Sequence, residues 1–186
     1  MSFTASTAFL PRMWNNRNDD LQNIPGLYGS VSGTSFITAD ADAGLACFKG
    51  DHMVGGGYQM TLASDGAQDI YFCNQGDVQR VPFGADKLFA VGVETLGLGA
   101  PAGELCTFTK AIPGETYAFG PGNFSTIVTT TNKYATVSNG YLVGSSSAPS
   151  DAGTIYFELD AGLGIDVFTE ANYGAFSRYN MLCRKV

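Results

Sequence analysis

The chain has 186 residues, which is enough for one domain that buries its own hydrophobic core. Glycine occurs 24 times, aromatic residues make up 12% and charged residues only 15%, a composition typical of short strands joined by tight turns. The net charge is −7, and this acidity argues against a nucleic-acid-binding surface, because phosphates would be repelled.

The charges are unevenly distributed along the chain. Residues 19–177 hold all 17 acidic residues and five basic ones, a net charge of −12, whereas residues 1–18 and 178–186 together hold five basic residues and no acidic one. Two interpretations stay open: the basic ends are incidental surface charge, or they dock on acidic neighbours.

Residues 1–35 are expected to form an extended N-terminal arm. Asn-rich polar stretches alternate there with isolated large apolar residues, including the only tryptophan, Trp14, and no period of 2 or 3.6 residues is sustained. Such spacing suits pockets on this domain or on a neighbouring chain. The first residues lack the features of a signal peptide, and no run approaches the ~20 apolar residues of a spanning helix, so we expect synthesis in the cytoplasm and no membrane partner.

From residue 36 onward, the sequence predicts an all-β fold, a compact β-sandwich or barrel-like domain of short antiparallel strands over 36–186. Runs of Val, Ile, Thr, Phe and Tyr alternate with clusters of Gly, Pro, Asn, Asp and Ser. The pair Asn139-Gly140 predicts a two-residue hairpin turn, because both residues tolerate a positive φ. Residues 166–179 are ambiguous between one turn of helix and a strand with a loop. Strands are predicted at 35–39, 44–49, 57–63, 68–73, 87–95, 103–110, 116–119, 125–130, 133–137, 140–143, 153–159, 165–169 and 178–184.

The four cysteines each lie in an apolar or strand-like run, and none belongs to a C-x-x-C pair that could begin a zinc site. We expect buried free thiols, with disulfide pairing as the alternative. The residues are Cys47, Cys73, Cys106 and Cys183.

Catalytic chemistry finds little support in the sequence. A serine or cysteine triad needs a histidine, and the only one, His52, lies beside Asp51 in a Gly-rich turn, where an exposed turn residue is expected. The glycines at 97, 99 and 103 fail the dinucleotide-binding pattern, because Pro101 intervenes and a strand follows. The acidic residues at 40 and 42 lack the ordered loop of a calcium site. We therefore expect no enzymatic activity, no cofactor and no bound metal.

Aromatic residues are more numerous than turns require, and most are expected in the core. The C-terminal group of Tyr173, Phe176 and Tyr179 lies among Gly, Asn and Ser, which makes it a candidate subunit interface.

The stretch from TADADAGLACFKGD to the C-terminus resembles the small cement or decoration proteins of tailed-phage heads. The likeness covers residues 36–186, whereas residues 1–35 depart from the family. It is carried by AGLACFKG, KLFAVGVETL, AGELCTFTKAIPGETYAFGPGN, SNGYLVGSSSAPSDAGTIYFELDAG and the closing MLCRKV. The resemblance implies a β-rich domain, commonly trimeric, that sits outside an icosahedral shell, clamps adjacent major capsid subunits and carries no catalytic residues.

These observations predict a virion structural protein on the capsid surface, made in the host cytoplasm, whose partners are the major capsid protein lattice and further copies of itself in a homotrimer. The arm would contact the lattice, and the C-terminal cluster would form a second contact. The alternative is a tail or head-fibre β-domain that recognises a host surface glycan through exposed aromatics beside Asp or Asn. The predicted partner-binding residues are Phe9, Leu10, Arg12, Trp14 and Arg17 in the arm, and Tyr173, Phe176, Tyr179 and Arg184 at the C-terminus.

Overall fold

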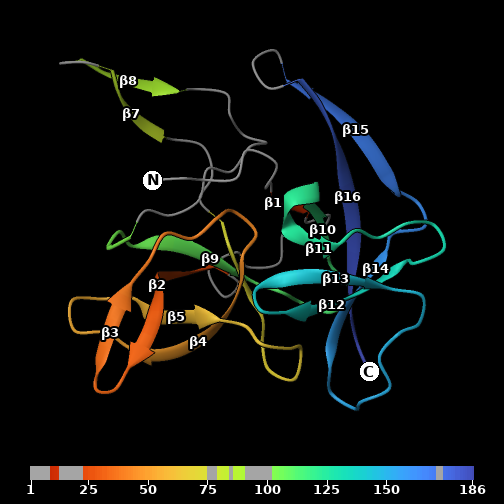
Figure 1. Ribbon diagram of the computed structural model, residues 1–186, viewed down its shortest axis with the longest axis horizontal. Helices are drawn as coiled ribbons and strands as arrows, with labels where there is room; N and C mark the ends of the chain where they lie inside the picture. Colours follow the sequence, from red (N-terminus) through yellow and green to blue (C-terminus); the bar gives the residue numbers. More distant parts are fainter. Residues whose placement is uncertain (1–8, 13–22, 75–78, 84–85, 91–101, 171–173) are drawn as a thin grey trace.

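The computed structural model of the protein describes residues 9–12, 23–74, 79–83, 86–90, 102–170 and 174–186. It is nearly all β, with 54% strand and 2% helix, and combines a closed five-strand barrel with a curled half-barrel sheet. The predicted all-β, barrel-like fold class is therefore confirmed. Figure 1 shows the barrel at the lower left and the second sheet on the right.

The barrel closes in the order β2-β5-β4-β6-β9 and back to β2. Closure comes from the pairing of β2 with β9, which places Asn23 opposite Thr109. Strands β2 and β5 run parallel, whereas the other barrel pairs are antiparallel, as expected. The barrel strands are β2 (Asn23–Ser32), β4 (Ala46–His52), β5 (Tyr58–Leu62), β6 (Tyr71–Cys73) and β9 (Cys106–Lys110).

Gly26 lies in the barrel wall where β2 pairs with both β5 and β9. A Cβ atom at this position would lie 2.4 Å from Cγ of Met60 and 2.7 Å from Cδ2 of Phe108, both of which are fully buried inside the barrel. A five-strand barrel has a narrow interior, and a residue without a side chain leaves room for these two large ones.

The second sheet runs in the order β1-β10-β16-β14-β12-β13-β11, and β15 pairs separately with β16. The long strand β16 is central, because it pairs with β10, with β14 and with β15. A short 3₁₀ helix, η1 (Pro121–Asn123), precedes β11. The strands are β1 (Phe9–Arg12), β10 (Thr116–Phe119), β11 (Phe124–Thr126), β12 (Tyr134–Ser138), β13 (Tyr141–Ser145), β14 (Ile155–Leu159), β15 (Ile165–Glu170) and β16 (Gly174–Lys185).

Two further hairpins complete the described strands. Strand β3 (Ser35–Thr38) pairs with the end of β2, and β7 (Gln79–Phe83) pairs with β8 (Asp86–Ala90) in a separate two-stranded sheet. No strand is predicted from the sequence at residues 79–83, because PFGAD, residues 82–86, is typical of a turn between strands.

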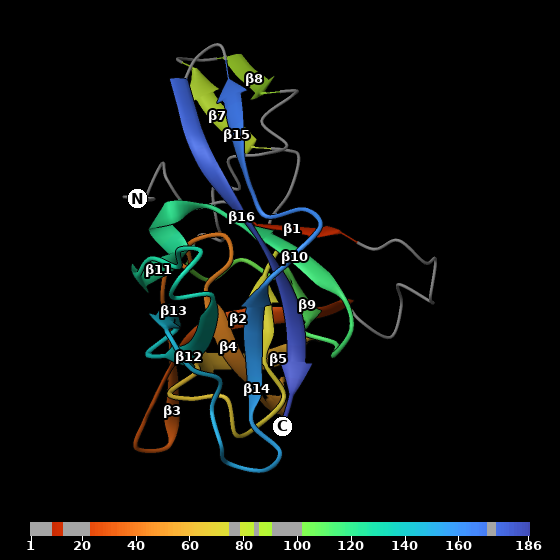
Figure 2. The same ribbon diagram turned by 90° about the vertical axis from the view of Figure 1, so that its right-hand side faces the viewer.

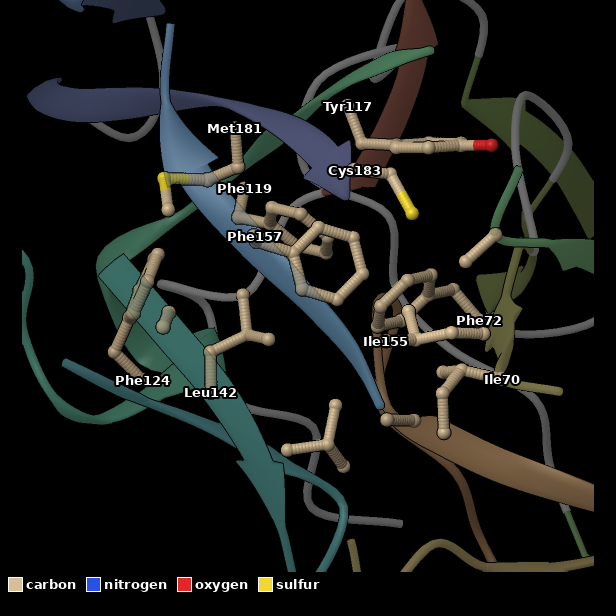
Figure 3. Packing of buried hydrophobic residues seen from close by; sticks show 14 of the residues in the cluster. Ile70, Phe72, Tyr117, Phe119, Phe124, Leu142, Ile155, Phe157, Met181 and Cys183 are labelled. Atoms are coloured by element: carbon tan, nitrogen blue, oxygen red, sulfur yellow. The ribbon is translucent and has the colours of Figure 1, made fainter. Parts of the chain in front are cut away.

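An aromatic core joins the barrel to the second sheet. Phe72 on β6 points away from the barrel interior and contacts Phe119 and Phe157 of the second sheet edge to face, with ring centroids 4.9 and 5.5 Å apart. Its neighbours in sequence, Tyr71 and Cys73, belong to the separate cluster inside the barrel. This alternation follows from the two-residue period of a strand. Figure 3 shows Phe72 beside Phe157, with Tyr117 and Met181 farther along the same cluster.

The described parts of residues 1–35 are extended, as expected, and both are paired within this chain. Strand β1 pairs with β10 at the edge of the second sheet, and β2 is a wall of the barrel. The expected division at residue 35 falls at the turn between β2 and β3, which are the two strands of one hairpin. Residues 23–32 are thus part of the body.

Local predictions in the C-terminal half have clear outcomes. The turn between β12 and β13 has two central residues, Asn139 and Gly140, with φ of 47° and 79°, which confirms the predicted hairpin. The ambiguous region around residues 166–179 is strand rather than helix in its described parts, because β15 and β16 pair there as an antiparallel ribbon.

Candidate functional site

His52 lies at the end of β4, exposed, with its ring edge against Tyr58 at a centroid distance of 5.2 Å. The ammonium group of Lys49 lies 4.7 Å from the centre of the same tyrosine ring. Across the described ranges, no group of three or more His, Cys, Asp or Glu side chains is placed to hold a metal ion. The immediate surroundings of His52 are therefore an aromatic ring and a cation.

All four cysteines are buried and free, which confirms the predicted thiols. Burial raises the pKa of Cys106 to about 11 and that of Cys183 to about 12, and it raises the pKa of Cys47 well above its usual value. Because a thiolate is the reactive form, these groups are held in their unreactive state.

The predicted arm residues have two outcomes. Phe9, Leu10 and Arg12 lie on β1, where their backbones face Phe119, Ala118 and Thr116 of β10 in the register of the sheet. Trp14 and Arg17 lie outside the described residues.

The predicted C-terminal cluster is not gathered into one surface. Tyr179 is only 8% exposed, and its ring packs edge to face on Phe124 at 5.1 Å, so it is a core residue. Phe176 lies on β16 opposite Phe168 in the register of the ribbon, and Tyr173 lies outside the described residues.

Arg184 is exposed near the end of β16. Its Nε lies 3.3 Å from Oε2 of Glu158, and the Lys133 Nζ donates to Oε1 of the same carboxylate at 2.8 Å. Hydrogen bonding to Lys133 holds the pKa of Glu158 below its usual value. Arg184 is thus one of two cations that already neutralise one acidic group.

The surface most suited to contact another molecule is a ribbon that sequence reasoning did not single out. This distal ribbon, formed by β15 and residues 174–179 of β16, extends away from the body in both views (Figures 1 and 2). On one face, Ile165 and Val167 are 41% and 72% exposed. On the other face, Arg178 donates to both carboxylate oxygens of Asp166 at 3.2 and 2.8 Å.

The outer edge of β15 pairs with no other strand within the described parts of the chain. Backbone N–H and C=O groups along such a strand edge can pair with a strand from another molecule. The alternation of Ile165, Asp166 and Val167 was a visible signal, but the sequence did not show that the apolar side would lack a covering layer.

A second exposed apolar region lies on the barrel. Val31 and Ile37, on the hairpin of β2 and β3, are each more than half exposed, and β3 has no strand on its outer side in the described residues. Val54, in the turn between β4 and β5, is fully exposed. These exposed apolar residues thus lie on separate elements, namely the distal ribbon, the hairpin of β2 and β3, and the turn between β4 and β5.

No helix in the described residues has the length and apolar character needed to cross a membrane. Comparison with known proteins finds no matching family model, no matching curated protein and no matching solved structure.

Proposed function

We propose that this chain is a structural protein of a tailed-phage virion, a decoration or cement protein that binds outside the head lattice and stabilises it by bridging major capsid subunits. It acts as a homotrimer and performs no catalysis. The proposal is supported by the resemblance of residues 36–186 to that class of protein. The observation that carries it is the distal ribbon, with exposed Ile165 and Val167 and an outer edge that pairs with no strand of the described residues.

The physical argument rests on rigidity and on projecting strands. A body made of two sheets that share one aromatic core loses little conformational entropy when it docks. An exposed strand edge can add to a sheet of a neighbouring subunit through backbone hydrogen bonds. A protein that binds the assembled lattice but not free subunits stabilises the lattice by mass action.

The direct test is co-sedimentation of the purified protein with empty heads assembled from the major capsid protein of the same virus. Replacement of Val167 by Gln should weaken binding at least about tenfold, because the apolar contact is lost from the ribbon. Val54→Gln is the matched control, since Val54 is also exposed but lies on the barrel. Unchanged head binding by the Val167 variant would remove the ribbon from the proposal.

Oligomeric state is a separate measurement. Light scattering should give a mass of three chains for the full protein. A truncation that tests the arm should remove residues 1–22 only, because this deletion leaves the barrel strands complete. A longer deletion would remove β2 and open the barrel. A monomer that ignores assembled heads and binds a glycan on an array would replace the proposal with a host-recognition role.

A further inference from the structure

A hollow of about 370 Å³ lies where the barrel meets the second sheet. It is bounded by the end of β9, the loop that follows it, the start of β14 and the end of β16. Its lining residues are Asp69, Lys110, Ala111, Ile112, Pro113, Ile155 and Lys185. The volume lies within the usual range for small-ligand sites.

One wall of the hollow is apolar and is held in place by a buried tyrosine. The hydroxyl of Tyr117 accepts a hydrogen bond from the N–H of Ile112 at 2.9 Å and donates one to the carbonyl oxygen of Lys110 at 3.1 Å. Tyr117 is fully buried, so the start of this loop is tied to the core. The wall formed by Ile112, Pro113 and Ile155 is therefore pre-formed.

The start of β14 is fixed by a close backbone approach. The N–H of Ile155 donates to the carbonyl oxygen of Gly66 at 2.8 Å, and a Cβ atom at Gly66 would lie only 2.2 Å from the carbonyl oxygen of Ile155. The glycine thus allows the loop before β6 to lie directly against β14. This contact brings the loop that carries Asp69 to the hollow.

The charged side of the hollow carries more cations than anions. Lys110 forms an ion pair with Asp69, and Lys185 pairs with no carboxylate in the described parts of the chain. An adjoining hollow of about 240 Å³ shares Asp69 and is also lined by Lys49 and Tyr71. The two adjoining hollows together are lined by three lysines and one carboxylate, on a protein whose net charge is −7.

We propose that this hollow binds a carboxylate-bearing peptide segment of a partner protein. The carboxylate lies between Lys110 and Lys185, and an apolar side chain next to it lies against Ile112, Pro113 and Ile155. Asp69 is available to accept a hydrogen bond from a peptide N–H. The carboxylate is either an acidic side chain or the end of a chain. The site does not depend on the capsid role proposed above.

The chemistry favours a peptide over a phosphate. The lining provides ammonium groups on flexible stems rather than the arginine forks that match phosphate. An inorganic anion would also leave the apolar wall without a contact. A peptide can contact the two lysines, the Asp69 carboxylate and the apolar wall at the same time.

The test is an NMR titration of ¹⁵N-labelled full-length protein with the tripeptide acetyl-Gly-Glu-Leu. Shifts should cluster at residues 69, 110–113, 155 and 185, with a dissociation constant of about 1 mM or below. Three analogues identify the carboxylate: the C-terminal amide, the Gln analogue, and the Gln analogue with a C-terminal amide. The analogue with both changes has no carboxylate and should not bind. If the C-terminal amide binds more weakly than the Gln analogue, the site uses the C-terminal carboxylate; the opposite order shows that it uses the Glu side chain.

Protein variants complete the test. Lys185→Gln should weaken binding of the tripeptide at least about fivefold, because a charge-assisted contact is lost. Lys133→Gln is the control, since Lys133 lies outside the hollow, and the variant should bind the tripeptide as the wild type does. The proposal would be overturned if the Lys185 variant bound the tripeptide as tightly as the wild type does. It would also be overturned if the wild-type protein bound the doubly neutral peptide or inorganic phosphate as tightly as it binds the tripeptide.

Discussion

The backbone N–H of Gly140 donates a hydrogen bond of 2.8 Å to the carbonyl oxygen of Ala63, and this bond ties the second sheet to the barrel. The carbonyl oxygen of Gly140 in turn accepts from the N–H of Ala46 at 2.9 Å. A Cβ atom at Gly140 would lie 2.5 Å from Cδ1 of Leu62. One turn residue thus serves both a hairpin and a junction between sheets.

Replacement of Gly140 by Ala should therefore destabilise the protein by about 2 kcal/mol or more, because a positive φ is costly for a residue with a side chain and the methyl group clashes with Leu62. Chemical denaturation measures this free energy of unfolding. Gly33→Ala is a matched control: its φ of 60° is also positive, but a Cβ there meets nothing within 4 Å. Equal losses for the two variants would mean that the contact with Leu62 contributes nothing.

Gly26→Ala should destabilise the protein by about 1–3 kcal/mol, the usual cost of overpacking, because the added methyl group meets Met60 and Phe108. Thermal unfolding followed by circular dichroism measures the change. In the double variant with Met60→Ala, Gly26→Ala should lower the free energy of unfolding by less, because the shorter side chain at position 60 leaves room for the added methyl group. Additive losses in the double variant would contradict this account.

Removal of the Tyr117 hydroxyl should cost about 1–3 kcal/mol, because Tyr117→Phe leaves the partly buried N–H of Ile112 without its partner. Tyr179→Phe is the control, since Tyr179 is also buried but its hydroxyl has no hydrogen-bond partner in the described residues. The same denaturation measurement serves both variants. The Tyr117 variant should also broaden the NMR signals of residues 110–113, and sharp, unshifted signals would argue against its role in holding the loop.

Stability should fall as the pH rises above about 9. In the unfolded chain the cysteines ionise near pH 9, whereas burial raises the pKa of Cys106 to about 11 and that of Cys183 to about 12. Above pH 9 the unfolded state therefore binds fewer protons than the folded state, and the free energy of unfolding decreases until the folded thiols also ionise. Below pH 9 these thiols contribute no pH dependence.

Cys106→Ala should make this decline between pH 9 and pH 11 shallower, by up to about 1.4 kcal/mol per pH unit. The measurement is the free energy of unfolding at several pH values, with the slope between pH 7 and 8 as the internal control. An identical slope in the variant would show that this thiol ionises equally in the folded and unfolded states.

The sequence by itself determined the all-β class and several local features. Strand-forming runs separated by Gly, Pro and Asn predicted short strands, and the Asn139-Gly140 turn formed as expected because its backbone preference is local. The burial of the cysteines followed equally from their apolar neighbours.

Tertiary structure alone decided the rest, because strand pairing depends on residues distant in the chain. Barrel closure places Asn23 opposite Thr109, and no local pattern specifies that partner or the parallel pairing of β2 with β5. Tyr179 looked suited to an interface, yet its place on β16 directs its ring against Phe124 in the core. The lysine-lined hollow draws on four separate segments, which come together only when the two sheets share one core.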